Sequence, residues 1–200
     1  MGAELLLETS PLKTFYLTLL LALALGACSK QDTPQASAAP VVASASSYDT
    51  VAANGKGFTV GAMMSAQTVY VLFEPQCPHC GRLWQASVPL HSQVKFVWIP
   101  VAFSAGKSVA QATALLSAAN PLDAMNAHEQ SLLAGQGGIA EAPSVPDDMA
   151  NAIKANTQLL TSLGVDSVPF LVAKHRKNGQ VVTQNGALDT VALATLLGIN

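Results

Sequence analysis

Two of the three cysteines in this chain lie close together, in the segment Cys77-Pro78-His79-Cys80. Two thiols at this spacing can contribute to a metal site, form a structural disulfide or exchange electrons with other thiols. The segment follows a run of β-forming residues at 68–73, and Pro78 is of a type favoured in the first turn of a helix. The pattern therefore predicts that Cys77 begins a helix and that Cys80 lies one turn further along.

The predicted position of Cys77 favours its thiolate form. A helix N-terminus presents unpaired backbone N–H groups and the positive end of the helix dipole, and His79 adds positive charge when it is protonated. We therefore expect the pKa of Cys77 to lie below the value of about 8.5 for a free cysteine. A stable thiolate is a good leaving group and makes the disulfide a stronger oxidant. We expect a labile redox pair in which Cys77 reacts first and the less exposed Cys80 resolves the mixed disulfide.

Other uses of the pair have weaker support in the sequence. A zinc site needs four ligands, and the chain's histidines show no close paired spacing; they are His79, His91, His128 and His175. Haem attachment needs a histidine directly after the second cysteine, where this chain has Gly81. A structural disulfide across two intervening residues would constrain the unfolded chain little. We predict no metal and no bound cofactor, because the dithiol itself carries the electrons.

The third cysteine, Cys28, follows an apolar run at residues 15–27. This run is shorter than the roughly 20 residues that a membrane span needs, and it has the length of a signal-peptide core. Its ending, LGAC, resembles a bacterial lipobox, whereas the alternative is an ordinary secretory signal. We predict a lipoprotein signal peptide at residues 1–27, lipidation at Cys28 and anchoring in the periplasm. Ser29, where an Asp would indicate the inner membrane, favours the outer membrane.

The remaining chain is predicted to form a tether and one domain. Residues 28–56 are rich in Ser, Ala and Pro and are expected to be a flexible tether from the lipid anchor. Residues 57–200 are long enough for one domain with its own core, in which Trp84 and Trp98 are expected to be buried. With a net charge of −2 and no basic cluster, the chain has no electrostatic footprint for nucleic acid.

The pattern of elements predicts an α/β domain. A buried strand at 68–73, a helix from Cys77 to about residue 88 and a strand at 94–99 favour a right-handed unit with parallel strands. A helical segment is expected at about 104–163, with Asp147 as an N-cap and Gly164 as the stop of its last helix. The remaining expected elements are a short first strand within 53–61, strands at 168–175 and 181–186 joined by an Asn-Gly turn, and a closing helix at 188–199.

This order of elements, with VYVLFEPQCPHCGRLW at residues 69–84, resembles the thioredoxin fold and the periplasmic disulfide-bond proteins of the DsbC/DsbG isomerase type. The resemblance covers about residues 57–199. It implies a thioredoxin-like fold (βαβ … ββα), with a helical insertion between the second strand of the βαβ unit and the strand that begins at a cis-proline. It also implies a thiol-disulfide oxidoreductase, an isomerase or reductase, that acts on cysteines of exported proteins.

The same resemblance implies roles for several residues. The Val168–Pro169 bond would be cis, lie against the cysteine pair and present the backbone of Val168 to an extended substrate peptide. Pro78 and His79 would set the redox potential. Glu74 could relay protons to the buried thiol or partly offset the cationic effect on the reactive cysteine. A solvated turn residue is the other reading of Glu74.

Two departures from DsbC and DsbG leave the direction of electron flow open. Those proteins carry an N-terminal dimerisation domain and a linker helix, which residues 29–56 do not resemble. Val168 and the CPHC motif resemble the oxidase DsbA, whereas DsbC and DsbG have Thr before the proline. The alternatives are therefore a DsbA-like oxidase or a non-catalytic peptide-binding or chaperone lipoprotein. The redox partner in the membrane would be a DsbD-like reductant or, for an oxidase, a DsbB-like oxidant.

Overall fold

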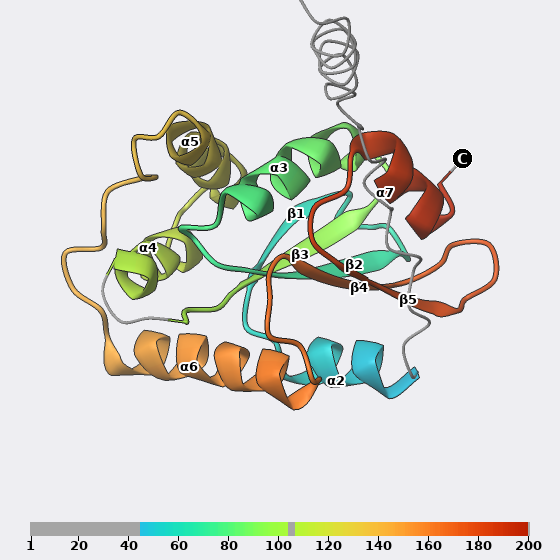
Figure 1. Cartoon of the computed structure of the whole chain (residues 1–200), viewed down its shortest axis with the longest axis horizontal. Coiled ribbons are helices and arrows are strands. Elements are labelled where there is room, and N and C mark those ends of the chain that lie inside the picture. The colour runs from blue at the N-terminus through green and yellow to red at the C-terminus, as the bar shows by residue number, and fades with distance from the viewer. Residues whose placement is uncertain (1–44, 104–106, 200) are drawn as a thin grey trace, which may run out of the picture. The chain divides into compact units, whose positions relative to one another are not determined.

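The computed structural model describes residues 45–103 and 107–199, which belong to one compact unit built on a five-stranded mixed sheet (Figure 1). The strand order is β1-β3-β2-β4-β5. The strands are β1 (Phe58–Gly61), β2 (Thr68–Phe73), β3 (Lys95–Pro100), β4 (Phe170–Lys174) and β5 (Val181–Asn185). Helices α3, α5 and α7 cover one face of the sheet, and α2 and α6 cover the other.

The central strand β2 fixes the register of the sheet. It pairs with β3 in parallel and with β4 antiparallel, and Leu72 lies opposite Phe170. The chain passes from β2 to β3 through α3 (Pro78–Ser87) and the 3₁₀ turn η1 (Val88–Leu90), which confirms the predicted strand-helix-strand unit. Because β4 runs antiparallel to β2, the start of β4 lies beside the carboxyl end of β2, where α3 begins.

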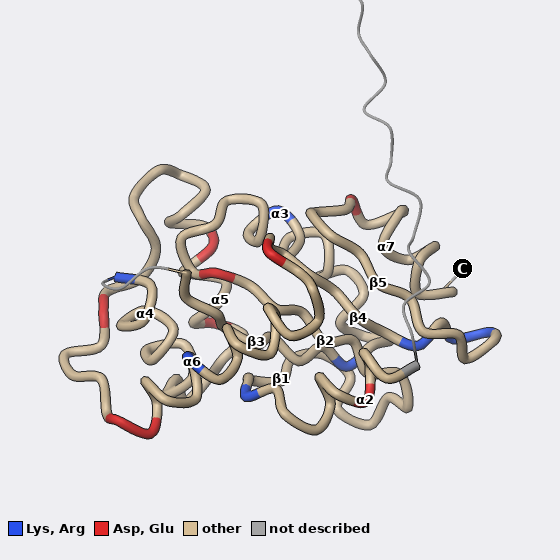
Figure 2. The backbone as a smooth tube through the Cα atoms, turned by 60° about the horizontal axis from the view of Figure 1, so that its bottom comes forward, with Lys and Arg blue, Asp and Glu red and all other residues tan. Residues whose placement is uncertain are grey.

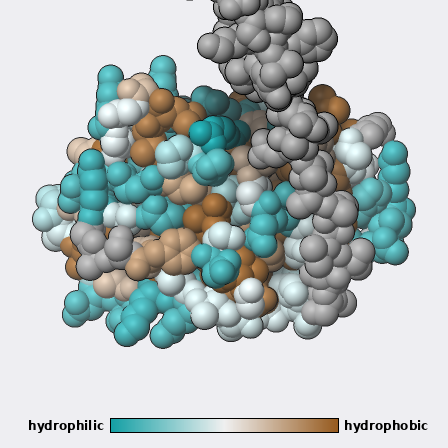
Figure 3. Space-filling view, viewed as in Figure 1, coloured by the Kyte–Doolittle hydropathy of each residue, from teal (hydrophilic) through white to brown (hydrophobic). Residues whose placement is uncertain are grey.

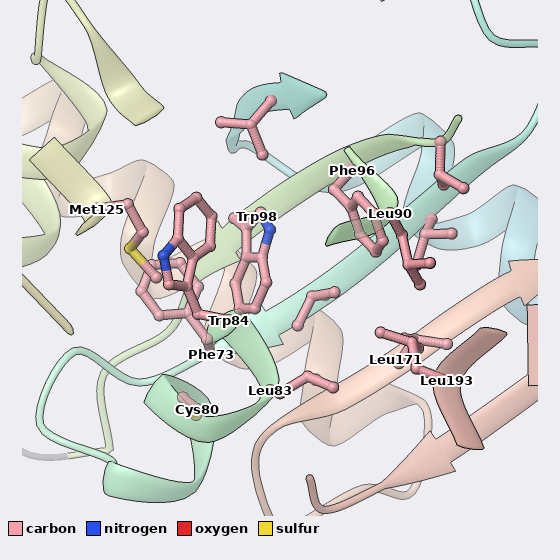
Figure 4. Packing of buried hydrophobic residues seen from close by; sticks show 14 of the residues in the cluster. Phe73, Cys80, Leu83, Trp84, Leu90, Phe96, Trp98, Met125, Leu171 and Leu193 are labelled. Atoms are coloured by element: carbon pink, nitrogen blue, oxygen red, sulfur yellow. The ribbon is translucent and has the colours of Figure 1, made fainter. Parts of the chain in front are cut away.

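An aromatic cluster fills the space between the sheet and α3 (Figure 4). Trp98 of β3 forms edge-on contacts with Phe73 of β2, at 5.6 Å between ring centroids, and with Trp84 of α3, at 5.1 Å. Leu193 of α7 (Thr190–Leu197) and Met125 of α5 (Pro121–Leu133) belong to the same cluster and are fully buried. The predicted burial of both tryptophans is therefore confirmed.

The opposite face of the sheet corrects the prediction of a flexible tether through residue 56. Residues Ala45–Asn54 form helix α2, and its Val51 is fully buried against the sheet and α6 (Asp147–Ser162). The Ser- and Ala-rich composition resembles a disordered segment, but packing of an apolar side chain holds such a helix in place. The rest of the predicted tether, the predicted signal peptide at 1–27 and Cys28 lie outside the described residues.

The predicted helical segment at 104–163 contains α4 (Lys107–Leu116), α5 and α6. The cap of α6 is Pro146 and not the predicted Asp147. The extended backbone at Pro146 precedes the helix, so the carboxylate of Asp147 lies in the first turn, near the positive end of the dipole. Gly164 directly follows Leu163, the C-cap of α6, and has a positive φ of 73°, as predicted for the stop.

Lysine, arginine, aspartate and glutamate are few, and they are spread over many elements of the backbone (Figure 2). On the face seen in Figure 3, hydrophobic residues form small patches separated by hydrophilic ones. No helix in the described part of the chain is long and apolar enough to span a membrane.

Candidate active site

The cysteine pair lies where β2 leads into α3. Cys77 is the N-cap of α3 with extended backbone, and Pro78 is its first helical residue, as the sequence predicts. The backbone N–H of Cys80 donates to the carbonyl of Cys77 at 3.0 Å. Both cysteines are free thiols; Cys77 is half-buried and Cys80 has no exposed surface. The first turn of the helix therefore places one accessible thiol and one buried thiol side by side.

The environment of Cys77 lowers its pKa to about 6. The largest cause is the hydrogen bond from the Cys80 thiol, and the backbone N–H groups of Cys80 and His79 also lower the pKa of Cys77. Partial burial and the negative charge of Glu74 act in the opposite direction. The predicted direction of the shift is confirmed, and the predicted offset by Glu74 is present.

The imidazole of His79 contacts the side chain of Arg82. Its Nδ1 accepts a hydrogen bond from Arg82 at 2.8 Å, on the exposed side of α3. The guanidinium is always protonated, so it is the donor in this contact. The backbone N–H of His79 is the group of this residue that lowers the pKa of Cys77.

Cys80 has the opposite electrostatic character. Burial raises the pKa of its thiol well above the ordinary value, and the interaction with the Cys77 sulfur raises it further. The buried thiol is therefore held protonated while the accessible thiol ionises. This asymmetry matches the predicted division into a reactive and a resolving cysteine.

The segment directly before β4, which contains Val168 and Pro169, lies against the cysteine pair. The Val168–Pro169 peptide bond is cis, and the carbonyl oxygen of Val168 lies 3.7 Å from the Cys77 sulfur. The carbonyl of Pro169 accepts a hydrogen bond from Gly186 at 2.8 Å, which ties this turn to the end of β5. The predicted cis bond and its place against the cysteine pair are therefore confirmed.

Polar contacts hold the turn between β2 and α3 in place. The carboxylate of Glu74 accepts a hydrogen bond from the backbone N–H of Gln76 at 2.7 Å, so Glu74 also has the turn-forming role of the alternative reading. The Gln76 side chain donates to Gln111 of α4 and to the carbonyl of Gly137. This fastens the turn to the helical insertion directly before Cys77.

A buried histidine, His128, also holds the turn between β2 and α3 in place, and the sequence did not predict this contact. His128 of α5 donates from Nε2 to the carbonyl of Pro75 at 2.7 Å, and its Nδ1 accepts from the backbone of Ile139 at 3.2 Å. Burial lowers the pKa of His128, so the ring is neutral in this arrangement. Its Nε2 therefore holds the turn before α3 and its Nδ1 holds the segment after α5, so both nitrogens are engaged by the backbone. Among the described residues, no group of three or more His, Cys, Asp or Glu could hold a metal ion.

The sequence also did not reveal Glu129, the neighbour of His128 on α5. Its side chain is buried, and it lies close enough for its charge to act on Cys80 and for the charge of Cys77 to act on it. The available signal was the helical spacing: Met125, His128 and Glu129 share one side of the helix, and Met125 belongs to the core. A carboxylate on an apolar face of a helix is rarely buried without a reason.

The low pKa of Cys77 gives a direct prediction for its reactivity. The thiolate is the nucleophile, so the rate of alkylation should rise with pH through a midpoint near 6 and level off above it. The rate should be measured by mass spectrometry between pH 4 and pH 9, values chosen to bracket an ordinary thiol at about 8.5. Cys80, buried and protonated, should remain unmodified under the same conditions. A midpoint near that of a free cysteine would contradict the arrangement described above.

Comparisons with known proteins agree with this architecture. No family model matches the chain. It is 27% identical over 134 residues to the thiol:disulfide interchange protein DsbG of Pseudomonas aeruginosa, a match that covers 66% of this chain. The match spans only about half of that relative, 51% of its length.

Several solved structures have folds similar to that of this chain. The catalytic domain of Proteus mirabilis ScsC has a TM-score of 0.58 and 20% identity, and the match covers 76% of this chain and 93% of that one. A periplasmic thioredoxin-like protein from Salmonella enterica serovar Typhimurium has a TM-score of 0.58 and 17% identity, with coverage of 77% and 95%. The thiol-disulfide exchange protein α-DsbA2 from Wolbachia pipientis has a TM-score of 0.55 and 13% identity, with coverage of 76% and 94%. The described part of this chain therefore has a thioredoxin-like fold, with a helical insertion between β3 and β4 and the cysteine pair at the start of α3.

Proposed function

We propose that this protein is a thiol-disulfide oxidoreductase that acts on cysteines of exported proteins in the periplasm. The observation that carries the proposal is the asymmetric pair at the start of α3, with the pKa of Cys77 lowered to about 6 and the Cys80 thiol buried. The likeness to DsbG and to the fold of ScsC supports the same chemistry.

The proposed reaction has two exchange steps. The Cys77 thiolate attacks a substrate disulfide, forming a mixed disulfide and releasing the other substrate sulfur as a thiolate. Cys80 then loses its proton and attacks the Cys77 sulfur, which releases the second substrate thiolate and leaves the Cys77–Cys80 disulfide. The reverse sequence oxidises a substrate dithiol. Isomerisation results when another cysteine of the substrate attacks the mixed disulfide before Cys80 does.

Neighbouring residues would tune the pair and orient the substrate. The backbone N–H of His79 stabilises the Cys77 thiolate, and Pro78 leaves no N–H of its own at the first helical position. The Val168 carbonyl, 3.7 Å from the Cys77 sulfur, lies where an extended substrate could align its backbone beside Pro169. We propose these two residues as the substrate-binding turn, with Glu74 modulating the thiolate by its charge.

We propose isomerase or reductase activity of the DsbC/DsbG type, in which a DsbD-like membrane partner keeps the cysteine pair reduced. A second direction, donation of disulfides with a DsbB-like partner, is favoured by the low pKa of Cys77, because a stabilised thiolate makes the disulfide a stronger oxidant. We also propose export by a signal peptide at 1–27 and lipid anchoring at Cys28, with the outer membrane as the expected location.

Two measurements test this proposal. The purified protein should catalyse exchange between glutathione disulfide and a peptide dithiol, and a rate equal to the uncatalysed one would overturn the proposed function. The direction of electron flow follows from the resting state of the pair in intact cells, trapped by acid and labelled with a mass-shifting thiol reagent. We expect mostly reduced Cys77 and Cys80, whereas a mostly oxidised pair would replace the isomerase assignment with oxidase.

A further inference from the structure

Among the described residues, Glu129 is the one acidic residue whose side chain is buried. It lies on the side of α5 that faces the cysteine pair. Its side chain is only 1% exposed, and neither carboxyl oxygen has a hydrogen-bond partner in the part of the chain that the structure describes. A buried carboxyl group without a partner destabilises a fold unless it is protonated or serves another purpose. The fold therefore retains at this position a group that packing alone would replace with an apolar residue.

The contact between α5 and α3 is shaped to admit this carboxyl group. Gly81, the residue directly after Cys80, lies against it: a Cβ atom at position 81 would come within 2.5 Å of the Glu129 Oε2 atom. The same Cβ would also come within 3.2 Å of Leu133. A glycine is therefore needed for α5 to bring the carboxyl group this close to the helical turn that carries both cysteines.

The groups around Glu129 are acidic or neutral on the side that faces the active site. The first turn of α3 contributes the thiols of Cys77 and Cys80, and the preceding turn contributes the carboxylate of Glu74. On α5 itself, both nitrogens of His128 are engaged by backbone groups. Strand β1 (Phe58–Gly61), which also packs against α5, has no titratable residue.

The segment after α5 contacts this helix through the backbone of Gly138 and Ile139, and helix α4 also packs against it. Helix α4 contributes the neutral Gln111 and, at its first residue, the cation Lys107, whose charge acts on His128. Burial is the largest cause that raises the pKa of Glu129, the negative charges of Cys77 and Glu74 act in the same direction, and together they bring it to about 8. In the reduced protein at neutral pH, Glu129 therefore carries a proton.

We propose that Glu129 exchanges a proton with Cys80 during disulfide transfer. This assignment rests on the proposed oxidoreductase function and adds a residue of the helical insertion to it. The carboxyl group does not hydrogen-bond to the Cys80 sulfur in the resting dithiol, where that thiol donates to Cys77. Once Cys77 is bonded to a substrate, its thiolate no longer accepts that hydrogen bond, and the Cys80 proton needs another acceptor.

The step balances in both directions. Once Cys77 is part of the mixed disulfide, Glu129 first releases its own proton to solvent. When Cys80 then attacks, its proton passes to the Glu129 carboxylate, directly or through one water molecule. A bond forms between the sulfurs of Cys80 and Cys77, and the bond from Cys77 to the substrate sulfur breaks. The electron pair of that bond leaves with the substrate thiolate, and Glu129 later loses its proton to solvent. In the reverse direction, protonated Glu129 supplies the proton to Cys80 as it is released from the disulfide.

The charge of Cys77 sets the timing of this transfer. While Cys77 is a thiolate, its negative charge helps keep Glu129 protonated. Formation of the mixed disulfide removes that charge, so the pKa of Glu129 falls and the carboxylate becomes available when Cys80 must lose its proton. Release of Cys77 as a thiolate restores the protonated state.

The test separates the two exchange steps. Reduced protein is mixed rapidly with a fluorescent peptide disulfide, and mixed-disulfide formation and its resolution by Cys80 are followed by acid quench at several pH values. We expect Glu129→Gln to slow resolution at least about tenfold at neutral pH, since general acid-base groups contribute about 10²–10⁴-fold. Formation of the mixed disulfide should persist. Glu129→Asp, which keeps a carboxyl group, should recover part of the rate of resolution.

The matched control is Glu141→Gln, the same chemical change at an exposed position. Resolution in Glu129→Gln at the rate and with the pH profile of this control would overturn the assignment of Glu129. Failure of the wild-type protein to form any mixed disulfide would instead overturn the proposed function. A measurement without substitutions is the NMR titration of the Glu129 carboxyl carbon. We expect a lower pKa of Glu129 in the disulfide form than in the dithiol form, and equal values would contradict the proposal.

Discussion

Replacing Cys77 with serine is expected to lower the rate of disulfide exchange by about a thousandfold or more, because a serine hydroxyl is hardly ionised at neutral pH and cannot form a disulfide. Replacing Cys80 with serine should have a different result. Cys77 remains accessible and can still attack a substrate, but the mixed disulfide then has no internal thiol to resolve it. The Cys80→Ser protein should therefore accumulate covalent complexes with substrate proteins.

The complexes can be counted after acid quench by non-reducing electrophoresis and identified by mass spectrometry. The matched control is the double variant Cys77→Ser, Cys80→Ser, which should capture nothing. Exchange by Cys77→Ser at the wild-type rate would refute the assignment of Cys77 as the attacking thiol. Equal capture by the single and double variants would show that the complexes do not depend on this cysteine pair.

The second large effect is expected in the aromatic cluster beneath α3. Trp98 is fully buried and contacts both Phe73 and Trp84, so Trp98→Ala would leave a large cavity between the sheet and the helix that carries Cys80. Truncation of a buried tryptophan to alanine typically lowers the free energy of unfolding by about 3–5 kcal/mol. The loss should be measured by urea unfolding of the oxidised and the reduced protein.

Trp98→Phe is the matched comparison. Phenylalanine keeps an aromatic ring in contact with its neighbours and removes the indole N–H, which is buried without a hydrogen-bond partner among the described residues. We expect it to lower the free energy of unfolding by clearly less than the alanine variant does. Equal losses in the two variants would mean that the aromatic contacts of Trp98 contribute little to stability.

Local signals in the sequence were sufficient to predict the part of the site formed by β2, the start of α3 and the cysteine pair. The β-forming run at 68–73 became β2, and Pro78 became the first residue of α3 with Cys77 as its cap. These features depend on backbone preferences within a few residues, so they can be read without knowing the rest of the fold. The lowered pKa of Cys77 follows from the same local geometry, first through the hydrogen bond from the Cys80 thiol one turn along the helix and then through the backbone N–H groups at the helix start.

The part of the site formed by Val168 and Pro169 comes from a segment far from the cysteines in the chain, so it depends on the tertiary fold. The cis bond at Pro169 was expected only from the resemblance to a known family, because proline alone does not determine its isomer. Its contact with Cys77 exists because β4 runs antiparallel to β2 and starts where β2 ends. The contact between the His79 ring and Arg82 on the exposed side of α3 was likewise not predicted from the sequence.

Two further features were decided by tertiary packing. The segment at 45–54 has the composition of a tether, yet Val51 finds an apolar surface between the sheet and α6 and the segment is helical. Glu129 looks like an ordinary surface residue in a helical run, yet the packing of α5 on Gly81 buries it beside the cysteines. The sequence by itself determined the dithiol, its helix and the order of elements, because these depend on short-range preferences. Only the tertiary structure decided which distant backbone and carboxyl groups meet the two sulfurs, because burial and close approach depend on how whole elements pack.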